Sequence, residues 1–188
     1  MPMLPRTLRL DASDTFVFER AAEPGEWAVT GSFLFWDQDV TALSGKARAA
    51  FRAGFVGVGS LGFSTLAVVT PASEAERAAA VEALADHLLR TFGAPDRAAA
   101  RAAAAEEVAF AASLCGHPVN TVLALHRTLE GGEIREQFRT LRPRDPGLSG
   151  ADRLHAHARA FTIVETDAEP EERVDFVGLM GPRPGGSS

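Results

Sequence analysis

The first third of the chain alternates apolar and polar residues, a pattern that predicts short strands. The stretches TLRLD (7–11) and DTFVFER (14–20) both alternate in this way. Residues 27–36, WAVTGSFLFW, are rich in residues that favour strands and predict a return strand after the Pro-Gly turn signal at 24–25. We therefore expect a small antiparallel meander, with the aromatic side chains of its last strand in the core: Trp27, Phe33, Phe35 and Trp36.

The middle of the chain has helical spacing instead. Ser73 and Glu76 form an S-x-x-E capping box, which predicts a helix start within residues 71–95. An apolar stripe at helical spacing follows: Val81, Leu84, Leu88 and Phe92. The alanine-rich residues 96–114 predict a second helix with a shallow apolar face, which packs close to its neighbour. A weaker pattern predicts a short helix within 40–54.

Residues 119–142 predict a β-hairpin. Gly131 and Gly132 suit a two-residue turn whose central residues both have positive φ. Counting outward from this turn pairs Leu129 with Ile134, Arg127 with Glu136, and Leu125 with Phe138. One face of the hairpin is then largely apolar, so we expect it to cover a core. A further strand is expected around residues 160–165, and another in RVDFVGLM (173–180).

Strands followed by two helices and then more strands indicate an α+β fold rather than a doubly wound sheet. We expect an antiparallel or mixed sheet with the two central helices packed on one face. The 188 residues fit one domain, taken as residues 1–180, followed by a disordered tail at 181–188.

Composition narrows the function classes. A net charge of -6 argues against unaided binding to nucleic acid, which requires a basic surface. No apolar run approaches the roughly 18 residues of a membrane span, and the N-terminus lacks the apolar core of a signal peptide. With one cysteine, no disulfide can form within the chain. These features predict a cytoplasmic protein that binds neither nucleic acid nor membrane.

A G-x-G-x-x-G match at residues 57–62 raises the question of dinucleotide binding. That fingerprint needs a helix N-terminus after the third glycine, and here a strand-like run, FSTLAVVT, and then Pro71 follow. We therefore favour a glycine-rich turn or bulge. The alternative is an anion nest formed by backbone N–H groups, assisted by nearby cations. Its candidate ligand-binding residues are Lys46, Arg48, Arg52, Gly57, Gly59, Ser60 and Gly62.

The cysteine and the histidines indicate a catalytic nucleophile or a metal site only weakly. Cys115 follows a predicted helix C-terminus, where the helix dipole disfavours a thiolate, so we expect a buried structural thiol. His155 and His157 share a face if their segment is extended, and His126 and His117 are candidate further metal ligands. Because nothing in the sequence brings them together, we expect surface histidines, no bound metal and no cofactor.

Two stretches, LPRTLRLDASDTFVFERAAEPGEWAVTGSFLFW and GSLGFSTLAVVTPASEAER, resemble a small family of uncharacterised bacterial proteins of similar length. The resemblance implies a loose association with the genes of formate-dehydrogenase-type molybdoenzymes. It thereby implies an accessory role in enzyme maturation, and it carries no catalytic residue to this chain.

Three functional hypotheses follow. The sequence favours a non-catalytic accessory or interaction protein, which binds a protein partner or a second copy of itself. The second hypothesis is a small-anion or cofactor binder that uses the Gly57–Gly62 loop. The third is an enzyme of unknown reaction.

Overall fold

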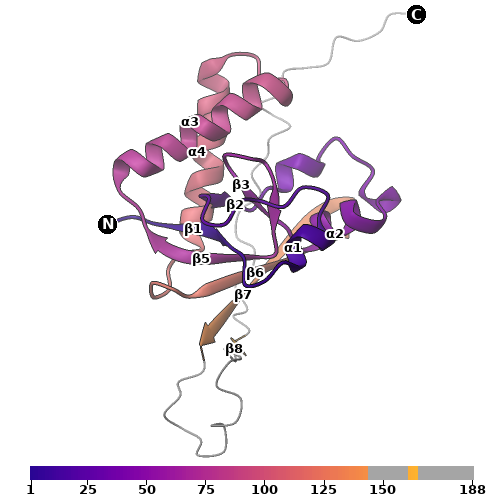
Figure 1. Cartoon of the computed structure of the whole chain (residues 1–188). Coiled ribbons are helices and arrows are strands. Elements are labelled where there is room, and N and C mark those ends of the chain that lie inside the picture. Colours follow the sequence, from indigo (N-terminus) through magenta and orange to yellow (C-terminus); the bar gives the residue numbers. More distant parts are fainter. Residues whose placement is uncertain (144–160, 165–188) are drawn as a thin grey trace, which may run out of the picture.

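A computed structural model describes residues 1–143 and 161–164 of the chain. Two predicted features, the strand at 173–180 and the tail at 181–188, lie outside these residues. Two antiparallel sheets form the β part of the fold (Figure 1). The larger has the order β1 (Met3–Leu8), β5 (Leu66–Pro71), β6 (Val122–Glu130), β7 (Glu133–Pro143), β8 (Phe161–Val164). The smaller has the order β2 (Ala28–Val29), β3 (Phe55–Gly57), β4 (Phe63–Ser64).

The helices complete an α+β fold, as the sequence predicted. The two long helices, α3 (Glu74–Thr91) and α4 (Arg97–Ser113), pack against each other, and α4 also lies against β1 and β2. The short helices α1 (Ser13–Val17) and α2 (Gly45–Ala53) lie together on the other side of the molecule (Figure 1). Two 3-10 turns, η1 (Ser32–Phe35) and η2 (Val40–Ala42), precede α2.

The hairpin register is the one counted from the sequence. Leu129 pairs with Ile134, Arg127 with Glu136, and Leu125 with Phe138. Gly131 and Gly132 have φ of 59° and 82°, so both turn residues adopt the left-handed conformation that glycine allows. The apolar face of the hairpin contributes Leu123 and Leu125 to a buried cluster, which confirms that the hairpin covers a core.

The predicted antiparallel meander in the first third is wrong: its first strand is β1 (Met3–Leu8) rather than residues 7–11, and β1 pairs with β5 in a different sheet from β2. Residues 14–20 contain helix α1 instead of a strand, because the backbone turns back on itself and Phe18 N donates to Asp14 O at 3.0 Å. The buried Asp14 carboxylate fixes this helix by accepting from Thr65 Oγ1 at 2.6 Å and Thr65 N at 3.3 Å. Residues 27–36 form only the short strand β2, since Gly31, with φ of 82°, turns the chain into η1. Trp36, predicted to be buried, is 38% exposed.

The small sheet lies between two apolar clusters. Ala28 and Phe55 pack with Val69 and Leu123 of the large sheet. Their neighbours Val29 and Val56 belong to the cluster that α3 and α4 cover. Successive residues of β2 and β3 thus point to opposite faces of the small sheet, and both faces are buried. The small sheet therefore lies partly between the central helices and the large sheet.

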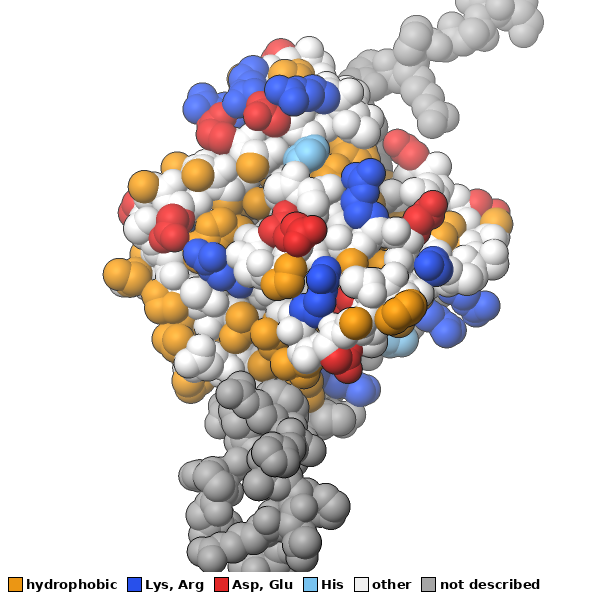
Figure 2. Space-filling view, in the orientation of Figure 1, with side chains coloured by type: hydrophobic (Ala, Val, Ile, Leu, Met, Phe, Trp, Pro, Cys, Tyr) orange, Lys and Arg blue, Asp and Glu red, His pale blue; other side chains and the backbone are white. Residues whose placement is uncertain are grey.

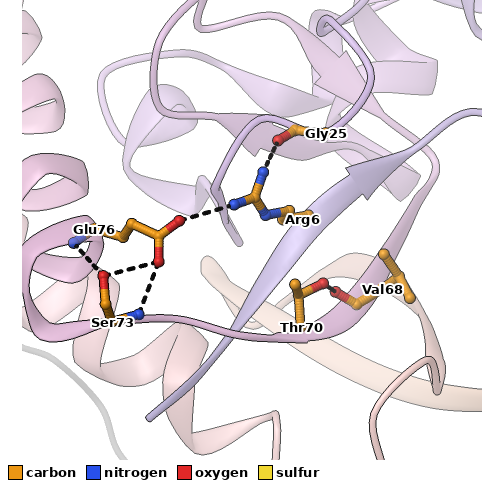
Figure 3. A network of polar contacts seen from close by, with 6 residues as sticks. All are labelled: Arg6, Gly25, Val68, Thr70, Ser73 and Glu76. Atoms are coloured by element: carbon orange, nitrogen blue, oxygen red, sulfur yellow. Dashed lines mark hydrogen bonds and ion pairs between the residues drawn. The ribbon is translucent and has the colours of Figure 1, made fainter. Parts of the chain in front are cut away.

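A polar network anchors the start of α3 (Figure 3). The predicted capping box forms: Ser73 Oγ accepts from Glu76 N at 3.2 Å, and Glu76 Oε2 accepts from Ser73 N at 2.8 Å. Glu76 Oε1 accepts from Arg6 Nη2 at 3.3 Å, and Arg6 Nη1 donates to Gly25 O at 3.0 Å. The guanidinium also stacks 3.7 Å from the ring centroid of Trp27. Arg6 therefore joins β1, the 24–25 turn and the helix cap.

Candidate functional site

The glycine motif forms a tight connection between β3 and β4. Gly57 N donates to Gly62 O at 3.0 Å, and Leu61 N donates to Gly57 O at 2.9 Å. The next elements are the strands β4 and β5, so the motif lacks the helix that a dinucleotide pyrophosphate needs. The segment is the glycine-rich turn that the sequence favoured.

The carboxylate of Glu26 fills this loop. Ser60 N donates to Glu26 Oε1 and Ser60 Oγ donates to Glu26 Oε2, both at 2.7 Å, and Glu23 N donates to Oε2 at 2.7 Å. A Cβ at Gly57 would lie 2.6 Å from Glu26 Oε2, and a Cβ at Gly59 would lie 2.9 Å from Oε1. The missing side chains of the glycines therefore leave room for an anion, and that anion is the Glu26 carboxylate of the same chain.

Neighbouring elements hold the rest of the loop. His87 Nε2 of α3 lies 2.9 Å from Gly59 O, and Arg20 Nη1 donates to Ser60 O at 3.3 Å. A Cβ at Gly62 would lie 2.6 Å from the backbone of Ala21. The loop is thus clamped between residues 20–26 and α3, which accounts for its glycines by close packing.

The three predicted anion-binding cations lie on the helix that precedes β3. Lys46, Arg48 and Arg52 are exposed on α2. Within residues 1–143 and 161–164, none of the three side chains forms an ion pair or a hydrogen bond, with Glu26 or with the glycine loop. The structure therefore brings Gly57, Gly59, Ser60 and Gly62 together around the Glu26 carboxylate, and within the described residues no cation of α2 is hydrogen-bonded to them.

Cys115 is buried at the end of α4, as predicted. Its thiol donates to Ala111 O with a sulfur–oxygen distance of 3.6 Å, and burial raises the pKa of the thiol to about 12. His126 is exposed on β6, and His155 and His157 lie outside the described residues. Among the residues that are described, no three His, Cys, Asp or Glu side chains are arranged to hold a metal ion.

Sequence reasoning missed the most unusual polar group, Arg127 of β6. Its side chain is 1% exposed and donates to Phe51 O and Gly54 O at 2.9 Å, to Ala50 O at 3.3 Å, and to Thr30 O. Three of these carbonyls belong to the last turn and C-cap of α2, where a helix leaves acceptors unsatisfied and carries partial negative charge. Arg127 therefore caps α2 from inside the core.

Two glutamates accompany this arginine. Glu136 Oε2 of β7 lies 3.7 Å from Arg127 Nε. Glu107 of α4 is buried, and its pKa is raised to about 8 by desolvation and by the charge of Glu136, with Arg127 opposing the rise. Within the described part of the chain, Glu107 Oε2 finds no hydrogen-bond partner. At neutral pH the cluster thus holds one ion pair and one protonated carboxyl.

The family model of DUF6505, a family of unknown function, matches residues 1–160. The chain belongs to the DUF6505 family. No curated protein and no solved structure matches it. The region matched to DUF6505 contains the glycine loop, the Arg127 cluster and both short helices.

The DUF6505 chain also exposes apolar side chains around α1. Phe16 is 75% exposed, Leu10 53% and Val17 40%, whereas Phe18, two residues after Phe16, is 1% exposed. Figure 2 shows hydrophobic side chains over α1 next to Lys and Arg side chains over α2. We call the surface formed by Leu10, Phe16 and Val17 the α1 surface. Among the residues described in this DUF6505 chain, no helix is long and apolar enough to span a bilayer.

Proposed function

We propose that this DUF6505 protein is a non-catalytic accessory protein that binds another protein through the α1 surface. The observation that carries the proposal is the exposure of Phe16, at 75%, beside two further exposed apolar side chains. Aromatic side chains supply much of the binding free energy at protein interfaces, and clustered exposed apolar residues are typical of such interfaces.

The polar chemistry of the interior supports the same proposal. The carboxylate of Glu26 accepts hydrogen bonds from Ser60 and Glu23, and the guanidinium of Arg127 donates hydrogen bonds to backbone carbonyls. The Cys115 thiol, with a pKa of about 12, is protonated at neutral pH. A nucleophile or a general base needs both a pKa near the operating pH and room for substrate. Glu107, with a pKa of about 8, meets the first condition, but it is a buried residue of α4.

We propose that this protein binds its partner during the maturation of a redox enzyme. The resemblance of its sequence to proteins associated with formate-dehydrogenase-type molybdoenzymes implies this setting. The test is co-purification. Tagged wild-type protein, coexpressed with such an enzyme, should retain it, and a Phe16→Ser variant should not. If neither protein co-purifies with the enzyme, this setting is wrong, and if both co-purify equally, the α1 surface is not the binding site.

Photo-crosslinking tests the α1 surface itself. A photoreactive phenylalanine analogue replaces Phe16 in cells, and the same analogue at Leu129, an apolar residue that is 39% exposed on β6, is the control. We expect a discrete crosslinked protein, identified by mass spectrometry, from position 16 and not from position 129. Identical products from both positions, or none from position 16, would contradict docking at the α1 surface.

Small-anion binding by the glycine loop is a second candidate, favoured by the fact that Ser60 N and Oγ already bind a carboxylate. An external anion must displace Glu26 from these donors. Inorganic phosphate should then raise the melting temperature of a Glu26→Gln variant more than that of the wild type, because only a ligand of the folded state stabilises it. Equal melting temperatures with and without phosphate, in both proteins, would eliminate this candidate.

A further inference from the structure

The charges on α2 are of one sign only. Its sequence, GKARAAFRA, has three cations and no acid, although the whole chain has a net charge of -6. All three cations are exposed, and within the described ranges their side chains form no ion pair. Two exposed arginines of α4 differ: Arg97 pairs with Glu82 and Asp86, and Arg101 pairs with Glu82. Within residues 1–143 and 161–164, the cations of α2 are thus exposed without a carboxylate partner.

This basic helix adjoins the α1 surface. Phe18, the C-cap residue of α1, packs in one buried cluster with Ala50 and Phe51 of α2. The flanking loops also carry exposed carboxylates, those of Asp11, Glu19, Asp37 and Asp39, and within the described residues none of them forms an ion pair with the cations of α2. Asp11 accepts from Ser13 N at 2.8 Å and Asp39 accepts from Thr41 N at 3.0 Å. The result is an exposed apolar surface beside a basic one, in the region that Figure 2 shows over α1 and α2.

We infer that the partner docks through an acidic segment with apolar side chains, which lies across α1 and α2. The inference rests on the proposed docking function and adds the chemistry of the partner. Apolar side chains of the segment cover Phe16 and Val17, and its carboxylates lie against Lys46, Arg48 and Arg52. Charge complementarity of this kind speeds encounter and excludes basic partners, while the apolar contacts supply most of the affinity.

The probe is a fluorescein-labelled synthetic peptide of alternating Glu and Leu residues, titrated with the full chain and followed by fluorescence anisotropy. The test variant carries Lys46→Ala, Arg48→Ala and Arg52→Ala. The control variant removes the same charge from the long helices, through Arg77→Ala, Arg90→Ala and Arg101→Ala. Circular dichroism spectra and melting temperatures establish that both variants fold.

We expect the α2 variant to bind the peptide about tenfold more weakly than the control variant, because three exposed ion pairs are lost. Added salt should weaken binding to the control variant and leave the α2 variant nearly unchanged. A Phe16→Ser variant should also lose affinity. A matched peptide with Lys in place of Glu should bind much more weakly than the acidic peptide.

Equal affinity of the α2 and control variants, or of the acidic and basic peptides, overturns the inference. So does crosslinking from position 16 to a second copy of the chain or within the same chain. Failure of the docking function gives a different result, since position 16 then captures no protein at all. If position 16 captures a partner that the α2 variant retains, the docking function stands and the acidic segment is wrong.

Discussion

Replacing Glu107 by Gln should stabilise the protein at alkaline pH and remove most of the pH dependence of its stability. In the folded chain the pKa of Glu107 is raised to about 8, against an ordinary value of 4.5, because burial and the charge of Glu136 disfavour its ionised form. Between these two pH values the folded state holds a proton that the unfolded state has released. The free energy of unfolding therefore falls as the pH rises through this window.

The structure sets the size of this effect. The two pKa values differ by about 3.5 units, and each unit corresponds to about 1.4 kcal/mol. The full loss is therefore on the order of 5 kcal/mol, of which about 4 kcal/mol falls between pH 5 and pH 8.5. A glutamine has nearly the same shape as glutamate and does not ionise.

Urea unfolding followed by tryptophan fluorescence measures the free energy of unfolding across this range. We expect the wild type to lose about 4 kcal/mol between pH 5 and pH 8.5, and Glu107→Gln to lose much less. Glu106→Gln is the matched control, because Glu106 is the neighbouring carboxyl on the same helix and is exposed. If the wild type and Glu107→Gln change in parallel with pH, the buried carboxyl does not control the pH dependence, and the reasoning is refuted.

Further perturbations test the other contacts. Arg127→Met should destabilise the protein by about 3 to 5 kcal/mol in urea, because it leaves buried carbonyls without a donor. Gly57→Ala should cost about 1 to 3 kcal/mol through its clash with the Glu26 carboxylate. The additional change Glu26→Ala should recover part of that loss, and strictly additive effects would contradict the clash. Cys115 should resist a thiol reagent at pH 8 in the folded protein and react in urea, since the pKa of its thiol is about 12. Ser73→Ala should cost about 1 kcal/mol of stability by removing the helix cap, and an unchanged urea midpoint would argue against it.

Local signals explain how much of the fold the sequence predicts. The capping box at Ser73, the Gly131–Gly132 turn and the alanine-rich helix are specified by residues close together in the chain, and all three form as predicted. Helix α1 was mistaken for a strand because Phe16, Val17 and Phe18 are residues that favour strands. In the structure Phe16 and Val17 are exposed on the short helix, and Phe18, its extended C-cap residue, is buried.

The site depends on contacts that spacing does not reveal. The sequence assigned the glycine segment to a turn, but the occupant of that turn, Glu26, precedes Ser60 by 34 residues. Counting residues outward from the Gly131–Gly132 turn placed Arg127 opposite Glu136, on the apolar face of the hairpin. A charged pair on an apolar face was the sequence signal that could have predicted a buried charge. Nothing near Glu107 in the chain indicates that α4 brings a third ionisable group to the same place.

Because Arg127 caps α2, the C-terminus of this helix depends on a residue that the ribosome adds much later. Arg127 follows Ala50 by 77 residues and Thr30 by 97. At about 5 to 20 residues per second, the ribosome therefore exposes the C-terminus of α2 for roughly 4 to 15 seconds before its donor is made. Until β6 has been synthesised, the carbonyls at the end of α2 lack the guanidinium that binds them in the folded protein, and α2 lacks the strand against which it packs. The emergence of the β6–β7 hairpin is accordingly the event that lets the first half of the nascent chain settle into its final fold.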